Sequence, residues 1–340
     1  MSRIKMTGPV VKNMPWQDKP KNLVGAPVWR YSDNPVVKRN PIEGVSRVFN
    51  SAVIPYKDGF VGVFRGEKLD GIPHIYLGWS KDAIHWEFRE KEIQFENEEG
   101  KPFMPLYAYD PRVVKIEDTY YIMWCQDFYG PSIGLAKTTD FERFVRLENP
   151  FIPFNRNAVL FPRKINGMYK MLSRPSDTGH TPFGDIFISE SPDLVYWGRH
   201  RHVMGTTKNW WEGLKIGSGA APIETSEGWL LFYHGVCHTC SGYVYSMGGA
   251  ILDLENPSIV KYRSRNFLLT PEEWYEERGF VPNVCFPCAT IHDSDTGRIA
   301  IFYGAADTYV ALAFTTLDEI VEYIKEHSSV TETDTEAGIR

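Results

Sequence analysis

The stretch that decides the fold is Gly59-Phe-Val-Gly-Val-Phe-Arg65, a short apolar run that ends in a charged residue. Similar runs follow tight turns at four further places along the 340-residue chain: Thr119-Tyr-Tyr-Ile-Met-Trp-Cys125, Gly167-Met-Tyr-Lys-Met-Leu-Ser173, Gly228-Trp-Leu-Leu-Phe-Tyr-His234 and Gly297-Arg-Ile-Ala-Ile-Phe-Tyr303. Short strands that repeat at about 50 to 70 residues are typical of β-propellers. The sequence therefore predicts an all-β fold, a five-bladed β-propeller around a central funnel.

Segments at both ends extend this ring. Residues 1–45 are rich in Pro and lack periodicity, so we expect an N-terminal arm that lies over the ring or over a neighbouring subunit. Blades are expected within residues 46–316, at about 46–100, 104–150, 155–205, 214–262 and 281–316. Residues 317–340 are expected to form a C-terminal amphipathic helix, followed by a disordered polar tail. The apolar face of that helix comprises Leu317, Ile320, Val321 and Ile324.

Two shorter motifs have local interpretations. Thr270-Pro-Glu-Glu predicts a short helix with Thr270 as its N-cap. Ser80-Lys-Asp-Ala-Ile-His-Trp86 resembles the Asp-box of sialidases, but it lacks the glycine of that box and does not recur cleanly. We interpret it as a turn followed by a Trp that packs between blades.

Composition and charge narrow the class of protein. The net charge of −6 argues against a nucleic-acid partner, because such proteins carry a basic surface. No apolar run reaches the length of a membrane span, and the N-terminus has no apolar signal region. We therefore expect no membrane partner, a cytoplasmic protein and cysteines that remain thiols.

Two cysteine pairs could suggest a zinc site. They are Cys237-His-Thr-Cys240 and Cys285-Phe-Pro-Cys288, and they lie much further apart than the paired cysteines of a compact zinc ribbon. Strand alternation would also point the members of each pair in different directions. We interpret these residues as structural thiols and expect no metal site.

Polar residues stand at the strand ends that a propeller brings to its axis. Such residues taken singly are most often solvated strand ends or turn caps. Together they give more cations than a plain glycosidase needs, because glycoside hydrolysis mainly requires two carboxylates. Arginines suit an oxyanion such as phosphate. The set comprises Arg65, Arg156, Arg174, Lys215 and His234 as cations and Asp110 and Asp307 as carboxylates.

Six longer motifs are distributed along the chain: Phe49-Asn-Ser-Ala, Tyr107-Ala-Tyr-Asp-Pro-Arg112, Asn155-Arg-Asn157, Arg174-Pro-Ser-Asp, Gly179-His-Thr-Pro-Phe-Gly and Tyr233-His-Gly. Through these motifs the chain resembles the β-mannoside phosphorylases of glycoside hydrolase family 130, from about residue 27 to residue 325. The resemblance is greatest to the subgroup that acts on β-1,4-mannosyl oligosaccharides and β-1,4-mannosyl-N-acetylglucosamine. It implies a five-bladed propeller and inverting phosphorolysis to α-mannose 1-phosphate, with phosphate as co-substrate and no cofactor.

The same resemblance assigns roles to individual residues. Asp110 is implied to be the catalytic acid, acting through the 3-hydroxyl of the mannosyl unit, and we expect a neighbouring aromatic wall to keep it protonated by desolvation. The implied phosphate ligands are Arg156, Arg174, Lys215 and His234. The implied mannose ligands are Asn50, Ser51, Arg65 and Asp307. The implied lining of the acceptor side comprises Tyr109, His180, Tyr243 and Phe286.

Several alternatives stay open at this point. One is an inverting hydrolase with Asp110 as acid and Asp307 or Asp185 as base. Another is a sialidase-like propeller in which Arg65, Arg156 and Arg174 hold a carboxylate, and a third is a non-catalytic carbohydrate-binding ring. Within the phosphorylases, the sequence leaves open the acceptor sugar (N-acetylglucosamine or chitobiose from N-glycans, mannose, or glucose as in mannosylglucose phosphorylases), the chain length and whether the protein forms a homo-oligomer.

Overall fold

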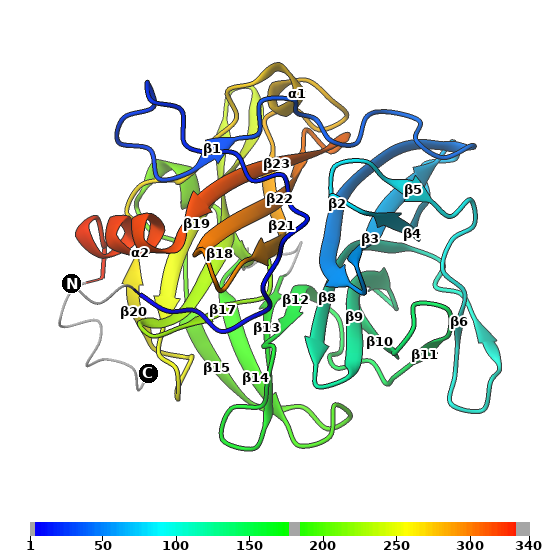
Figure 1. Ribbon diagram of the computed structural model, residues 1–340. Coiled ribbons are helices and arrows are strands. Elements are labelled where there is room, and N and C mark those ends of the chain that lie inside the picture. The colour runs from blue at the N-terminus through cyan, green and yellow to red at the C-terminus, as the bar shows by residue number, and fades with distance from the viewer. Residues whose placement is uncertain (1–3, 177–183, 331–340) are drawn as a thin grey trace.

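The computed structural model describes residues 4–176 and 184–330, in which antiparallel sheets surround a common axis as the blades of a five-bladed β-propeller (Figure 1). The first strand of each blade lies nearest the axis: β2 contacts β8 and β21, and β8 contacts β12. Blade 1 comprises β2 (Val45–Tyr56), β3 (Gly59–Lys68), β4 (Pro73–Ser80) and β5 (Glu87–Phe88). Blade 3 comprises β12 (Asn155–Leu160), β13 (Tyr169–Pro175), β14 (Ile186–Ser191) and β15 (Gly198–Met204).

Blades 2 and 4 carry additional strands. In blade 2, β6 pairs in parallel with β11, so residues expected in blade 1 belong to the outer edge of blade 2. Stacking explains this placement, because the ring of Phe95 lies 4.6 Å from that of Trp124 in blade 2. Blade 2 comprises β6 (Phe95–Glu96), β7 (Pro102–Phe103), β8 (Ala108–Ile116), β9 (Thr119–Asp127), β10 (Pro131–Thr138) and β11 (Phe144–Arg146). Blade 4 follows the 3₁₀ helix η1 (Trp210–Glu212) and comprises β16 (Lys215–Ser218), β17 (Ile223–Thr225), β18 (Gly228–Thr239), β19 (Gly242–Leu252) and β20 (Val260–Arg263).

The N-terminal arm closes the ring. Blade 5 takes β21 (Cys285–His292), β22 (Arg298–Ala305) and β23 (Tyr309–Thr316) from the C-terminal part of the chain, and its outer strand β1 (Trp29–Arg30) from the arm. Arg30 binds the buried carboxylate of Glu276 through two nitrogens, at 2.8 and 2.9 Å. Because the strands that meet here come from opposite ends of the chain, the arm is part of the propeller and not only a cover.

The two α-helices lie on the outside of the ring. Helix α2 (Leu317–Glu326) is the predicted amphipathic helix, and its predicted apolar residues are all buried. Helix α1 (Trp274–Glu277) begins later than predicted: Glu273 is its N-cap, in a capping box with Glu276. The predicted N-cap, Thr270, has its hydroxyl 2.9 Å from that of Ser246 instead. Residues 331–340, for which we expected a disordered tail, lie outside the described residues.

One turn recurs in blades 1 to 3, contrary to the expectation that Ser80–Trp86 would have no clean repeat. In each copy an Asp accepts hydrogen bonds from the backbone N–H groups two and three positions ahead, and the residue after it has a positive φ of 60 to 70°. Trp86 packs edge-on against Phe64 within its own blade, 4.9 Å between centroids. The shared pattern is a hydroxyl residue, any residue, Asp, and four positions later an aromatic: Ser80–Trp86, Thr138–Phe144 and Ser191–Trp197.

Neither α-helix of residues 4–176 and 184–330 has the length and hydropathy that a membrane span requires.

Candidate active site

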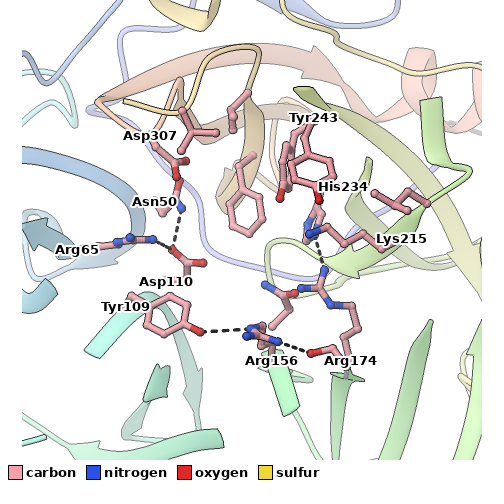
Figure 2. A pocket seen from close by; sticks show the side chains of 17 residues that line it. Asn50, Arg65, Tyr109, Asp110, Arg156, Arg174, Lys215, His234, Tyr243 and Asp307 are labelled. Atoms are coloured by element: carbon pink, nitrogen blue, oxygen red, sulfur yellow. Dashed lines mark hydrogen bonds and ion pairs between the residues drawn. The ribbon is translucent and has the colours of Figure 1, made fainter. Parts of the chain in front are cut away.

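A cavity of about 670 Å³ opens where the inner strands of the blades converge (Figure 2). Every residue predicted for the site lines it except two. Ser51 is buried directly behind Asn50 and its Oγ has no hydrogen-bond partner in the described part of the chain, while His180 lies outside the described residues. The lining comprises Asn50, Arg65, Tyr109, Asp110, Arg156, Asn157, Arg174, Ser176, Leu214, Lys215, His234, Tyr243, Tyr245, Val281, Val284, Phe286 and Asp307.

Equivalent β-bulges place three of these side chains. The inner strands β2, β8 and β12 each gain one residue relative to the neighbouring strand, and the bulge residue has a positive φ: 47° at Asn50, 50° at Asp110 and 53° at Asn157. Bulges and sparsely populated backbone angles often re-aim side chains at functional sites. Sequence reasoning missed Asn157, although aligning Phe49-Asn-Ser-Ala with Tyr109-Asp-Pro-Arg and Arg156-Asn-Ala-Val would have found it.

One half of the cavity, here the carboxylate half, is built around Asp110. Its Oδ1 accepts a hydrogen bond from Asn50 Nδ2 at 2.7 Å and one from Arg65 Nη1 at 2.9 Å (Figure 2). Arg65 also binds Glu67, and its guanidinium lies 4.3 Å from the centroid of the Phe49 ring. Burial alone would lower the pKa of Arg65, but the nearby carboxylates outweigh it and raise that pKa. Asp110 Oδ2 has no hydrogen bond to any described residue and remains available to a ligand.

The second carboxyl of this half, Asp307, is desolvated by burial. The hydrogen bonds of Asp110 come from the polar groups of Asn50 and Arg65, and the aromatic wall expected to desolvate it stays a prediction. Burial raises the pKa of Asp307 to about 7, against the opposing effect of Arg65 and with a further contribution from the charge of Asp110. Asp307 lies in the turn after β22, where its φ is 46°. This carboxyl therefore changes its charge near neutral pH.

The other half of the cavity, here the cation half, has a different charge balance. Arg174 Nη1 lies 3.1 Å from His234 Nε2, so this nitrogen of the imidazole accepts a hydrogen bond (Figure 2). Burial, followed by the charges of Arg174, Arg112 and Lys215, holds the pKa of His234 well below its usual value. The imidazole is therefore neutral. Burial also lowers the pKa of Arg174, and nearby Arg156 adds to that effect.

The remaining cations of this half have no carboxylate partner within residues 4–176 and 184–330. Arg156 donates hydrogen bonds to Ser176 Oγ at 2.6 Å and to the Tyr109 hydroxyl at 3.3 Å. Burial, with Arg174 and Arg156, lowers the pKa of Lys215 to about 8. Over residues 4–176 and 184–330, no ion pair joins a carboxylate to Arg156, Arg174 or Lys215. Three neighbouring cations with no carboxylate partner among the described residues can bind an oxyanion.

Aromatic residues flank the cation half. Lys215 Nζ lies 5.3 Å from the ring centroid of Tyr243 and 5.4 Å from that of Tyr245. Tyr243 is 47% exposed and forms part of the rim. Phe286, in contrast, is buried against the His234 ring, with centroids 4.4 Å apart. Sequence reasoning missed Tyr245, although alternation along β19 places it on the same face as Tyr243.

Arg112 does not line the cavity and, like Asn157 and Tyr245, had no predicted role. Its guanidinium is buried and donates hydrogen bonds to the carbonyls of Gly219 at 2.6 Å, Pro111 at 3.0 Å and Pro287 at 3.4 Å. These carbonyls belong to three blades. A buried cation with satisfied donors at this position ties the blades together. The carbonyls of Gly219 and Pro287 come close to Arg112 only when the blades form the ring, so no local sequence pattern indicates these contacts.

The cysteine pairs lie apart from this cavity. Among the described residues no three His, Cys, Asp or Glu side chains are placed to hold a metal ion. Cys240 is exposed, whereas Cys237, Cys285 and Cys288 are buried free thiols. Burial raises the pKa of the Cys288 thiol to about 12 and disfavours the thiolate that zinc requires. Metal independence nevertheless remains a prediction.

The structure argues against two of the alternatives: the hydrolase with Asp185 as its base and the sialidase-like propeller. Asp185 does not line the cavity; it is paired with His202 at 3.0 Å. A sialidase-like clamp would require Arg65 beside Arg156 and Arg174, yet Arg65 is bound to Asp110 and Glu67 in the opposite half. Asp307 remains the carboxylate that shares the cavity with Asp110.

The cavity combines a carboxylate with a group of cations that suits an oxyanion. This combination is typical of an enzyme that acts on glycosides and uses a phosphate-like co-substrate. The chain belongs to glycoside hydrolase family 130, described as beta-1,4-mannooligosaccharide phosphorylase, which it matches over residues 11–326. It is 53% identical over 332 residues to a beta-1,4-mannooligosaccharide phosphorylase of Ruminococcus albus, covering 96% of this chain and 98% of that protein.

More distant relatives share the fold. A beta-1,2-mannobiose phosphorylase of Listeria innocua is 36% identical over 76% of this chain and 70% of the relative. The solved structure of a beta-1,2-mannobiose phosphorylase from that organism, in complex with beta-1,2-mannobiose, superposes with a TM-score of 0.78 at 29% identity over 88% of this chain and 99% of that one. A 4-O-beta-D-mannosyl-D-glucose phosphorylase of Bacteroides fragilis is 26% identical over 87% of this chain and 80% of the relative.

Proposed function

We propose that this protein is an inverting β-1,4-mannoside phosphorylase that converts β-1,4-mannooligosaccharides or β-1,4-mannosyl-N-acetylglucosamine into α-mannose 1-phosphate and a shortened sugar. The observation that carries the proposal is the charge balance of the cavity. Arg156, Arg174 and Lys215 have no described carboxylate partner, and they share one cavity with Asp110. The 53% identity to a β-1,4-mannooligosaccharide phosphorylase supports the choice of linkage.

In this proposal a phosphate oxygen attacks the anomeric carbon of the mannosyl unit from the cation half. The bond from that carbon to the leaving oxygen breaks, and the leaving oxygen receives a proton that originates from Asp110 and passes through the 3-hydroxyl. The proton that hydrogen phosphate loses restores Asp110 for the next turnover. Phosphate is already a nucleophile, so no second carboxylate is required to activate water, in contrast to inverting hydrolysis.

The cation half has two tasks in this scheme. It offsets the repulsion between the phosphate dianion and the carboxylate half, and it stabilises the charge during transfer because its donors are fixed before the reaction. The carboxylate half would hold the mannosyl unit through Asn50, Arg65 and Asp307. Free thiols and a charged, phosphate-derived product also favour a reducing, phosphate-rich compartment such as the cytoplasm.

Phosphate dependence tests this proposal against the hydrolase alternative, in which Asp307 would activate water. The protein would be incubated with β-1,4-mannobiose, β-1,4-mannotriose and β-1,4-mannosyl-N-acetylglucosamine, with and without inorganic phosphate. We expect α-mannose 1-phosphate, identified by ³¹P NMR, and turnover that rises with phosphate. Release of free mannose at an equal rate in phosphate-free buffer would establish a hydrolase.

A further inference from the structure

Gly304 leaves no room for a side chain beside the carboxylate half. It lies on β22, one strand away from the axis, and pairs with Phe286 on the inner strand β21. A Cβ atom at this position would lie 1.7 Å from Asn50 Oδ1, 2.9 Å from Asn50 Cγ and 3.1 Å from the Asn50 backbone nitrogen. An added Cβ atom would overlap the side chain of Asn50 and would crowd its backbone nitrogen, so Asn50 would have to shift. Only glycine fits the observed position of Asn50.

Asn50 depends on that space to reach Asp110. Its side chain is buried, and Nδ2 donates the 2.7 Å hydrogen bond to Asp110 Oδ1. Asn50 Oδ1, which faces Gly304, has no hydrogen-bond partner within the described part of the chain. The orientation of the amide follows from Asp110, because a carboxylate oxygen can accept only from the nitrogen end. The oxygen end is held by packing against Gly304 rather than by a donor.

The consequence for Asp110 concerns which of its oxygens reaches the ligand. Oδ1 is engaged by both Asn50 and Arg65, whereas Oδ2 has no partner in residues 4–176 and 184–330. If Asn50 moves, Arg65 alone holds Oδ1 and the carboxyl group can rotate. A general acid must lie within hydrogen-bond reach of its target in the correct orientation, so such rotation reduces proton transfer.

We propose that Gly304 is a positioning residue for the general acid: the space it leaves seats Asn50, and Asn50 fixes the carboxyl group of Asp110 with Oδ2 toward the glycoside. This proposal rests on the proposed function of Asp110 and deepens it. It makes Gly304, a residue on a strand of blade 5, a determinant of catalysis by residues of blades 1 and 2.

The central experiment is a double-mutant cycle of Gly304→Ala and Asn50→Gly, with kcat measured on β-1,4-mannobiose at saturating phosphate. Asn50→Gly removes the obstructing side chain and suits the backbone angle of 47° at this position. We expect Gly304→Ala to lower kcat roughly 10- to 100-fold in the wild type, the size of effect that loss of a hydrogen bond to a charged group produces. In the Asn50→Gly background the same change should lower kcat less than about threefold, because the two changes act on one contact.

A second substrate separates positioning from general damage. In 2,4-dinitrophenyl β-mannoside the leaving group departs without a proton, so acid catalysis contributes little. We expect the loss caused by Gly304→Ala to be at least about fivefold smaller on this substrate than on mannobiose, with an unchanged KM for phosphate. Gly249→Ala is the matched control: its Cβ would meet Ile324 and Leu268 in the core, so it should lower the melting temperature and leave kcat unchanged.

Two results would overturn the inference. One is an equal loss from Gly304→Ala in both backgrounds; the other is an equal loss on both substrates. If Gly304→Ala does not fold in the wild-type background, the Asn50→Gly background decides: a native melting curve of the double variant supports the contact, and failure to fold there as well overturns it. Failure of the proposed function is distinguishable, because it would appear in the wild type as turnover without phosphate.

Discussion

The two halves of the cavity hold their charges in opposite ways. In the carboxylate half Arg65 and Asp110 are paired with each other: Arg65 binds Asp110 and Glu67, and Asn50 donates to the same oxygen of Asp110. In the cation half Arg156, Arg174 and Lys215 have no described carboxylate beside them, and burial lowers the pKa values of Arg174 and Lys215. The pairing of Arg65 with Asp110 is therefore formed without a ligand, whereas the cations of the second half are stabilised when an anion binds.

This difference predicts which kinetic constant each half controls. Groups in a satisfied, preorganised network act on the transition state, so their loss appears in kcat. Groups that await an anion contribute binding energy, so their loss appears in the KM for that anion. Substitutions in the two halves test this division directly.

The largest effect is expected from Asp110→Asn in the carboxylate half. The amide is nearly isosteric but cannot supply a proton, and it must also present its oxygen to Arg65 and Asn50. We expect kcat on unactivated β-1,4-mannosides to fall on the order of 10³-fold or more, with little change in KM for phosphate. Steady-state kinetics together with a melting curve check this. Retention of more than a tenth of the wild-type kcat by a natively folded variant would remove Asp110 from the role of acid.

A smaller effect is expected from Arg174→Ala in the cation half. Arg174 lies against His234 and near Arg156, and it has no carboxylate partner among the described residues. Loss of a charge-assisted contact costs about 1.5 to 3 kcal/mol, so KM for phosphate should rise roughly 10- to 150-fold while KM for the mannoside changes little.

The control for this variant is Arg89→Ala. Arg89 forms an exposed ion pair with Glu142 outside the cavity, so both constants should stay near their wild-type values. If Arg174→Ala raised the two KM values equally, or only that for the mannoside, Arg174 would belong to the sugar-binding half.

The pH dependence offers a third test of the cation half. The pKa of Lys215 is about 8 because burial and the two arginines disfavour its charge. Its ammonium is therefore present below pH 8 and is lost as the pH rises through that value. We expect kcat/KM for phosphate to fall up to about tenfold between pH 7 and 9, by loss of one charged contact. Lys215→Arg should remove this decline, because arginine stays protonated; an unchanged decline in that variant would exclude Lys215 as its cause.

The sequence indicates the residues at strand ends more clearly than the residues at the β-bulges. Arg65, Arg174 and His234 each follow a short apolar run of similar length. Because the ends of such strands converge on the axis of a propeller, these residues were predicted for the site. The propeller itself follows from those runs. The bulges at Asn50, Asp110 and Asn157 leave a weaker signal, visible only when the blades are aligned with one another.

Other features depend on contacts that no local pattern contains. The outer strand Trp29–Arg30 has two residues and pairs with Phe314 at the other end of the chain, so neither length nor periodicity marks it. The surroundings of Asp307 and the contact between Gly304 and Asn50 likewise arise only when blades 5 and 1 meet. The ion pair between Arg65 and Asp110 also joins residues of two blades, so no local pattern indicates it.

The smallest effect is expected for the choice of acceptor sugar. This choice concerns the rim of the cavity, next to the two halves compared above. We expect N-acetylglucosamine or β-1,4-linked chitobiose to serve at least as well as glucose in the reverse reaction from α-mannose 1-phosphate. The exposed ring of Tyr243 and the ring of Tyr109 offer apolar surface to an acetamido methyl, whose burial contributes about 0.8 kcal/mol. That is only a few-fold in kcat/KM, so mannose should compete.

Initial rates with glucose, mannose, N-acetylglucosamine and chitobiose at one concentration measure this preference. Tyr243→Ala should lower the rate with N-acetylglucosamine a few-fold more than the rate with glucose, because only the former has a methyl group to bury. Tyr243 is 47% exposed, so the variant should fold normally. A glucose rate more than tenfold above that of N-acetylglucosamine would instead place the acceptor specificity with the mannosylglucose phosphorylases, and the rim would then select for the smaller sugar.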